Sequence, residues 1–286
     1  MDFRVLGPLE VVGDGGLEVA IGTGRQRALL ALLLLRANEL VTSERLVEEL
    51  WGESAPATAH KMLHNQVSAL RQALGRNGRL ETHGSSYRLN VQAGELDVDR
   101  FEELLASARA ELQSDPGAAA QQLREALGLW RGSALSDLTY EQFAQAEIAR
   151  LEERRWVAFE ARVEAELALG RHADLVAELE AAIAEQPLRE HLRAQLMLAL
   201  YRCGRQADAL EAYREARRTL VEEVGVEPGA ELRALQDAIL AHDPALDLPV
   251  AAESESPVPD HPPRYRLERG GGQNINPHRP SFTDGR

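Results

Sequence analysis

The stretch 56-PATAHKMLHNQVSALRQALG-75 repeats apolar residues at the spacing of a helix that buries one face. These residues recur at i, i+4, i+7 and i+11 and are Leu63, Val67, Leu70 and Leu74. Pro56 suits a first helical turn and Gly75 suits the end of a helix, so the stretch predicts a helix over residues 56–74. At about 100° per residue, the opposite face carries polar side chains and no acid. Its members are Lys61, Asn65, Ser68 and Gln72, with His64 and Arg71 at its flank.

This acid-free face has the side chains that a helix needs in the major groove of DNA. Amides can form paired hydrogen bonds with base edges, and long cationic side chains can donate to bases. A polar face that only meets solvent would explain the same residues equally well. The neighbouring segments favour the first interpretation.

The segment that follows, 79-RLETHGSSYRLNV-91, predicts a two-stranded hairpin. Three helices followed by such a hairpin is the order of a winged helix-turn-helix. His83 and Arg88 would then lie on or beside the wing, near phosphates or the minor groove.

Two shorter helices are predicted before the polar-faced one. A capping box that begins at Thr23 predicts the start of the first. Thr42 begins a second start signal, and Gly52 is the predicted stop of that helix. Arg25 and Arg27 lie at the start of the first helix, where side chains and backbone amides can jointly bind phosphate.

The chain begins with two β-rich runs, FRVLGPLEVV at 3–12 and LEVAI at 17–21. The Gly-rich segment 13–16 between them is typical of a hairpin turn. Together with the helices and the wing, these runs predict an α+β winged helix-turn-helix domain over residues 1–93.

The charge balance changes near residue 94. Residues 1–93 carry ten Lys/Arg and ten Asp/Glu, whereas residues 94–246 carry 17 basic and 30 acidic residues. The net charge of −14 therefore belongs almost entirely to the second part, and it leaves the first part able to meet a polyanion.

Residues 95–243 have helical patterns almost throughout and contain an internal repeat. GRHAD at 170–174 and GRQAD at 204–208 begin 34 residues apart, which is the tetratricopeptide period. Stacked helix pairs predict an all-α array with a concave surface for protein contacts, the alternative being a passive spacer. The segment 247–286 holds seven prolines and few apolar residues, and it is predicted to be a disordered tail.

Several other classes of protein are disfavoured. Cys203 is the only cysteine, which fits a reducing cytoplasm and leaves no cysteine-based metal cage. The longest apolar run, residues 28–35, is far too short for a membrane span. His60 and His64 have a spacing that can bind zinc, but no third ligand lies near them in sequence. No nucleophile–base motif occurs, so the sequence predicts neither an enzyme nor a bound cofactor.

The order GPLEV, GRQRALLALLLLRAN, ERLVEELWG and VSALRQALG, followed by a wing with Tyr87, resembles the winged helix of the SARP/AfsR family. These Streptomyces antibiotic regulatory proteins have a DNA-binding domain of the OmpR/PhoB type. LREALGLWRG and the repeat region resemble the family's bacterial transcriptional activation domain. Two departures are Ala69, where the family usually has a basic residue, and a THGSSY wing in place of TRPPGY. No phosphate-binding loop occurs, so the chain is similar to the short members.

The resemblance implies a cytoplasmic, nucleoid-associated transcription activator. It would bind direct repeats in double-stranded promoter DNA as a homodimer, and residues 95–243 would recruit RNA polymerase holoenzyme. Its targets would be genes of antibiotic biosynthesis. The alternative is a repeat-based adaptor or signal sensor whose N-terminal module has only vestigial DNA binding.

Overall fold

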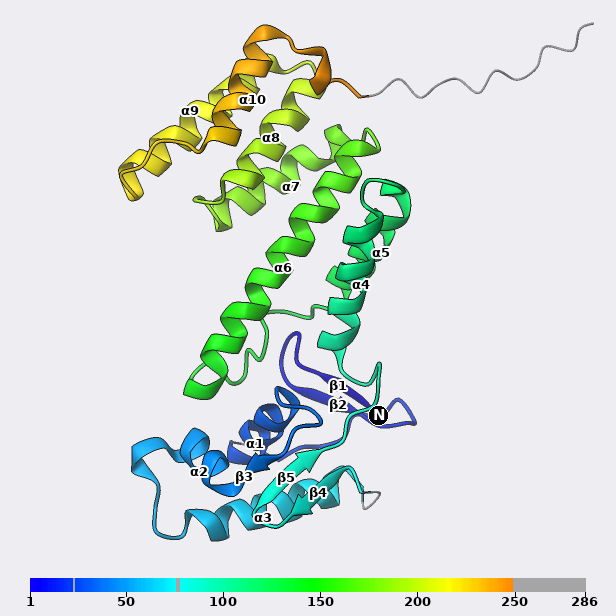
Figure 1. The fold of residues 1–286 in the computed structure, drawn as a ribbon, viewed down its shortest axis with the longest axis vertical. Helices are drawn as coiled ribbons and strands as arrows, with labels where there is room; N and C mark the ends of the chain where they lie inside the picture. Colours follow the sequence, from blue (N-terminus) through cyan, green and yellow to red (C-terminus); the bar gives the residue numbers. More distant parts are fainter. Residues whose placement is uncertain (23, 76–77, 249–286) are drawn as a thin grey trace, which may run out of the picture. The chain divides into compact units, whose positions relative to one another are not determined.

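The computed structural model describes residues 1–22, 24–75 and 78–248, and residues 1–248 form one compact unit (Figure 1). A small module of helices and two short sheets is followed by an array of longer helices. This confirms the predicted fold class. The tail from residue 249 and the predicted cap Thr23 lie outside the described residues.

The first β-rich run is not one strand, as predicted, but two. β1 (Asp2–Arg4) and β2 (Glu10–Val12) pair antiparallel, with Phe3 opposite Val11. The chain reverses between them because Val5 and Leu6 give their N–H groups to a distant carboxylate instead of a neighbouring strand. The predicted second strand at 17–21 contributes only a single bridge, between Val12 and Glu18.

The first two helices build the centre of the N-terminal core. α1 (Arg25–Leu34) buries every residue from Ala28 to Leu34. α2 (Ser43–Trp51) begins where the Thr42 hydroxyl accepts from the Arg45 N–H at 3.2 Å, and it ends at Gly52, as predicted. A short 3₁₀ turn, η1 (Gly52–Ser54), follows.

The polar-faced helix, α3 (Ala59–Ala73), begins three residues later than predicted. The Pro56 carbonyl accepts from the Ala59 N–H at 2.9 Å, so Pro56 lies in a turn before the helix. The predicted buried stripe is confirmed, since each of its four leucine and valine side chains is at most 1% exposed.

The predicted wing is confirmed as β4 (Leu80–His83) and β5 (Ser86–Leu89), which pair antiparallel. A third strand that was not predicted, β3 (Val41–Thr42), pairs with β5, so the sheet order is β3-β5-β4. The wing is thereby anchored to the start of α2.

Seven helices make up the array. They are α4 (Asp97–Glu111), α5 (Pro116–Gly128), α6 (Gln142–Ala168), α7 (His172–Glu185), α8 (Glu190–Arg202), α9 (Gln206–Glu223) and α10 (Ala230–Ala241), with the 3₁₀ turn η2 (Pro244–Leu246) after them. In the described segments, no helix combines the length and apolar character needed to cross a membrane.

The buried side chains form three clusters. The first holds α1–α3 and the two sheets, and it also includes Leu135, Leu138 and Ala144. The second joins α4 and α5 to residues 151–165 of α6, and the third joins the end of α6 to α7–α10. The long helix α6 therefore contributes to all three clusters.

Candidate nucleic-acid interface

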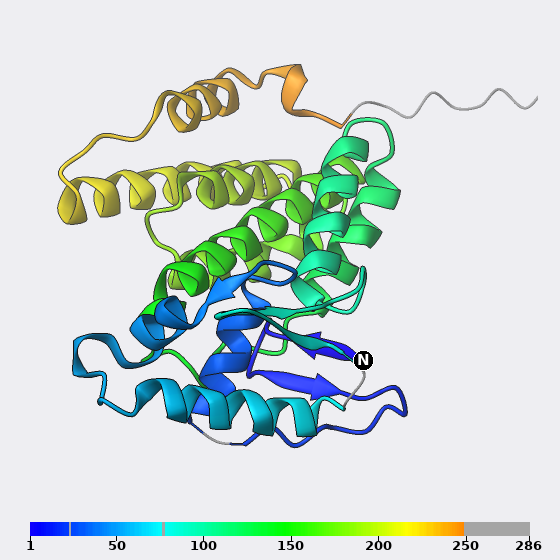
Figure 2. The same ribbon diagram turned by 60° about the horizontal axis from the view of Figure 1, so that its bottom comes forward.

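The acid-free face of α3 is exposed along its whole length. Its four residues, Lys61, Asn65, Ser68 and Gln72, all lie in solvent, one helical turn apart. Figure 2 shows α3 along the outside of the N-terminal module, where no other element covers that side. The helix thus presents a row of donors and amides about three turns long.

His64 and Arg71, predicted at the flank of this face, connect α3 to the wing. The His64 Nδ1 lies 3.1 Å from the Tyr87 hydroxyl. The Arg71 Nε donates to the Leu80 carbonyl at 2.9 Å, and its Nη2 donates to the Thr82 hydroxyl. These contacts fix the orientation of α3 against the hairpin, which is a positioning role that the sequence did not reveal.

His83 and Arg88 lie on the wing, as predicted, and Glu81 lies between them. Its Oε2 is 2.9 Å from His83 Nε2 and 2.7 Å from Arg88 Nη2. The hydrogen bond from His83, together with that from Arg88, lowers the pKa of Glu81 to about 2. Glu81 therefore holds both His83 and Arg88, a pairing that the sequence did not reveal.

Arg25 and Arg27 have different surroundings, although the sequence placed them together. The exposed Arg25 guanidinium lies 4.8 Å from the centre of the Trp51 ring. Arg27 is half-buried, and its Nε donates to Asp137 at 2.8 Å. Asp137 also accepts from the Leu9 N–H at 2.9 Å, so Arg27 ties α1 to the loop before α6.

A buried carboxylate joins the module to the array. Asp97, 1% exposed at the start of α4, accepts from the backbone N–H groups of Val5 and Leu6 at 2.9–3.0 Å. Burial raises its pKa, while these hydrogen bonds and the nearby Arg131 oppose the rise. The Arg131 N–H in turn donates to the Leu6 carbonyl at 2.8 Å. No sequence pattern indicated this role for Asp97.

A second contact connects the wing to the segment just before α4. Arg79, just before β4, forms two hydrogen bonds of 2.7 Å with Glu95. Glu95 also accepts from the Gln92 N–H, and its pKa falls to about 2, chiefly because of Arg79. Glu95 and Asp97, where the connecting segment meets α4, thus both bind residues of the N-terminal module.

The described residues hold no group of three His, Cys, Asp or Glu side chains arranged to bind a metal ion. His60 is exposed on the first turn of α3, and His64 is engaged with Tyr87.

Comparison with known proteins matches both halves of the chain. The family model "Transcriptional regulatory protein, C terminal" matches residues 18–89, and "Bacterial transcriptional activator domain" matches residues 96–240. The regulatory protein DnrI of Streptomyces peucetius is 42% identical over 258 residues, which cover 86% of this chain and 94% of DnrI.

Longer relatives match over part of their length. The regulatory protein AfsR of Streptomyces coelicolor is 41% identical, and the match covers 89% of this chain but 26% of AfsR. The solved structure of Mycobacterium tuberculosis EmbR in complex with a low-affinity phosphopeptide superposes with a TM-score of 0.81 and 39% identity. That match covers 85% of this chain and 65% of the EmbR chain. On these matches and this fold, the chain belongs to the SARP/AfsR family of bacterial transcriptional activators.

Proposed function

We propose that this chain activates transcription by inserting α3 into the major groove of promoter DNA. The observation that carries the proposal is the row of four exposed, acid-free positions on α3, fixed against the wing by His64 and Arg71. A rigid helix with amides and donors on one face is the arrangement that reads base edges. Membership of an activator family supports the same function.

Asn65 and Gln72 carry the base readout in this proposal. Their amides can accept from and donate to one adenine edge at once, whereas Lys61 can donate to guanine or to a phosphate. Ser68 lies between them and can bond with either kind of group. The replacement of a basic residue by Ala69 beside this row fits an operator that differs from those of relatives.

Phosphate contacts come from Arg25, His83 and Arg88, which lie on either side of the α3 row. Such contacts position a protein on the duplex and are not sequence-specific. On the wing, a phosphate has to compete with Glu81 for both His83 and Arg88. Arg27 already has Asp137 as its partner, so its phosphate role requires that this ion pair opens.

The division of labour places DNA binding in residues 1–93 and protein contacts in residues 95–243. One winged helix reads few base pairs, so two copies on adjacent direct repeats supply the selectivity that a promoter needs. The helical array carries the acidic surplus, which keeps it off DNA and offers a surface to RNA polymerase holoenzyme. The targets proposed for this homodimer on nucleoid DNA are genes of antibiotic biosynthesis.

The decisive experiment is footprinting of the full chain on promoters near its own gene, followed by base substitution in the protected site. Asn65→Ala and Gln72→Ala should each relax the preference at one or two base positions, by about 1–3 kcal/mol for each lost contact. Gln66→Ala is the matched control, since Gln66 lies on the same helix but is turned away from the row.

Unchanged base preference in both variants would place the readout elsewhere. A full chain that leaves no footprint at low salt would instead favour the adaptor or sensor, in which the helical array carries the function alone.

A further inference from the structure

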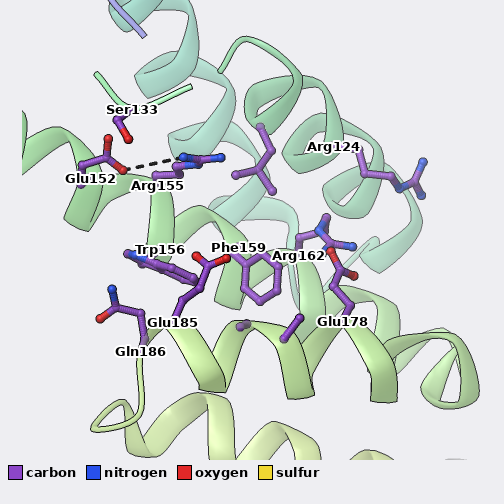
Figure 3. A pocket seen from close by; sticks show the side chains of 13 residues that line it. Arg124, Ser133, Glu152, Arg155, Trp156, Phe159, Arg162, Glu178, Glu185 and Gln186 are labelled. Atoms are coloured by element: carbon purple, nitrogen blue, oxygen red, sulfur yellow. Dashed lines mark hydrogen bonds and ion pairs between the residues drawn. The ribbon is translucent and has the colours of Figure 1, made fainter. Parts of the chain in front are cut away.

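A cavity of about 720 Å³ opens between α5, α6 and α7, away from every residue assigned to DNA (Figure 3). This volume lies within the range of about 300–1,000 Å³ that is typical of small-molecule sites. Its apolar wall is formed by Trp156 and Phe159 of α6, whose ring centroids are 5.6 Å apart with an interplanar angle of 71°. The small side chains of Ala181 and Ala182 of α7 also line the cavity and leave space beside the two rings.

At one end of the cavity the charges neutralise each other. Arg162 is nearly buried, and its Nη2 donates to Glu178 at 2.6 Å while its Nη1 donates to Glu166 at 3.2 Å. Arg124 also donates to Glu166, at 3.2 Å. Two cations therefore meet two acids, and this end offers no net charge to a ligand.

At the other end of the cavity, one carboxylate is not paired with a cation. Glu152 accepts from the Ala134 N–H at 2.8 Å and lies 3.8 Å from Arg155. Glu185 lines the cavity too, but it has no hydrogen-bond or ion-pair partner in the part of the chain that the structure describes. Figure 3 shows its carboxylate beside Trp156 and Phe159.

The end of α7 adds to this negative potential. Glu185 is the last residue of the helix and Gln186 is its C-cap, so the partial negative charge of the helix terminus falls at the same place. An exposed carboxylate at a helix C-terminus is electrostatically unfavourable until a cation approaches it. The site thus offers an unpaired carboxylate, next to aromatic rings, to which a cation can bind.

We propose that this cavity binds a small organic amine with a flat apolar body. The body packs on Trp156 and Phe159, and the ammonium group pairs with Glu185. These rings already attract cations, since Arg162 lies 5.0 Å from the Phe159 centroid and Arg189 lies 5.9 Å from the Trp156 centroid. The ligand would contact α5 and α7, which belong to different buried clusters that both include residues of α6.

The test is calorimetric titration of the full chain with three probes of one ring system: tryptamine, 3-methylindole and indole-3-acetate. Tryptamine should bind about tenfold more tightly than indole-3-acetate, with the neutral probe between them. Glu185→Gln should weaken tryptamine about fivefold and remove the preference for the amine over the acid. Glu164→Gln, at an exposed position of α6, should leave all three affinities unchanged.

A blocking variant separates this cavity from other sites. Ala181 is exposed on α7, so Ala181→Trp can fill the cavity while circular dichroism verifies that the fold is kept. It should abolish binding of all three probes. The proposal is overturned if amine and acid bind equally, if either Glu185→Gln or Ala181→Trp leaves tryptamine binding intact, or if tryptamine gives no heat at concentrations on the order of 10 mM.

Discussion

Glu81 holds His83 and Arg88 in an arrangement that a DNA phosphate would have to displace. All three side chains are at least a third exposed, and the acid places a negative charge on the part of the wing that should approach the DNA backbone. If the wing binds DNA as proposed, the strength of that binding depends on a residue that itself makes no favourable contact with DNA.

Glu81→Gln should tighten binding to all duplex sequences by about threefold, because it removes one repulsive charge and releases the Arg88 guanidinium and the His83 ring. The slope of log K against log salt should steepen by up to about one unit. Mobility-shift titrations at several salt concentrations measure both quantities, with Glu125→Gln in the array as control. Unchanged affinity would show that the wing stays away from the phosphates.

Glu95 makes the stability of the contact between the wing and the start of α4 depend on pH. Its side chain is 13% exposed and forms an ion pair with Arg79, and its folded-state pKa of about 2 lies below the ordinary value of 4.5. The ion pair therefore contributes its full stability above pH 4.5 and loses it as the pH falls through about 2. With allowance for solvent screening, this contribution is about 2 kcal/mol.

Glu95→Gln should lower the free energy of unfolding by about 1–2 kcal/mol at pH 7 and by much less near pH 2. Urea denaturation at the two pH values measures the difference. Glu39→Gln, an exposed acid of the same module, should have little effect at either pH. An equal loss at both pH values would mean that the carboxylate acts through packing and not through its charge.

At the scale of elements, sequence patterns predicted those features that depend on interactions between residues close together in the chain. The apolar stripe of α3, the cap of α2 by Thr42 and the wing all depend on residues a few positions apart. β3 was missed because two residues give no alternating pattern, and it forms only because β5 lies beside it. The run at 3–12 was misread because its interruption comes from Asp97, more than 90 residues away.

The same limit applies to the candidate site. The polar row of α3 follows from helical periodicity alone, so its four positions could be predicted. The pairing of Arg27 with Asp137, across 110 residues, has no local signal. Nor does the bond from His64 to Tyr87, which depends on how α3 and the wing meet.

The N-terminal module should not fold well when it is cut at residue 93. Its buried cluster includes Leu135, Leu138 and Ala144, and the cut removes Asp97 as the acceptor for two buried N–H groups. We expect residues 1–93 to lack a cooperative thermal transition. Residues 1–169, which contain the first two clusters complete, should retain one.

Circular dichroism melts of the two fragments and the full chain provide the measurement. A melting temperature of residues 1–93 that equals that of residues 1–169 would show that the contacts with Leu135, Leu138 and Asp97 are dispensable.

At the scale of the whole molecule, the proposed assembly requires that two copies on direct repeats lie on the same face of the duplex to meet one polymerase. Insertion of about five base pairs between the repeats turns one copy to the opposite face, whereas about ten restores the phase. Transcription with purified polymerase should therefore fall with the first insertion and recover with the second. Equal activity on both templates would contradict a side-by-side pair.

Because α6 contributes to all three buried clusters, it limits where two family members can be joined to make a hybrid regulator. A crossover between two family members near residue 94 would mismatch Asp97, Leu135 and Ala144 with a foreign N-terminal module. A crossover at Gly170, after α6 ends, leaves those contacts intact and confines the mismatch to the contacts between α6 and the helices α7–α10. Operator preference would then be inherited with residues 1–169, and the exchangeable cassette would be the stack from α7 to α10.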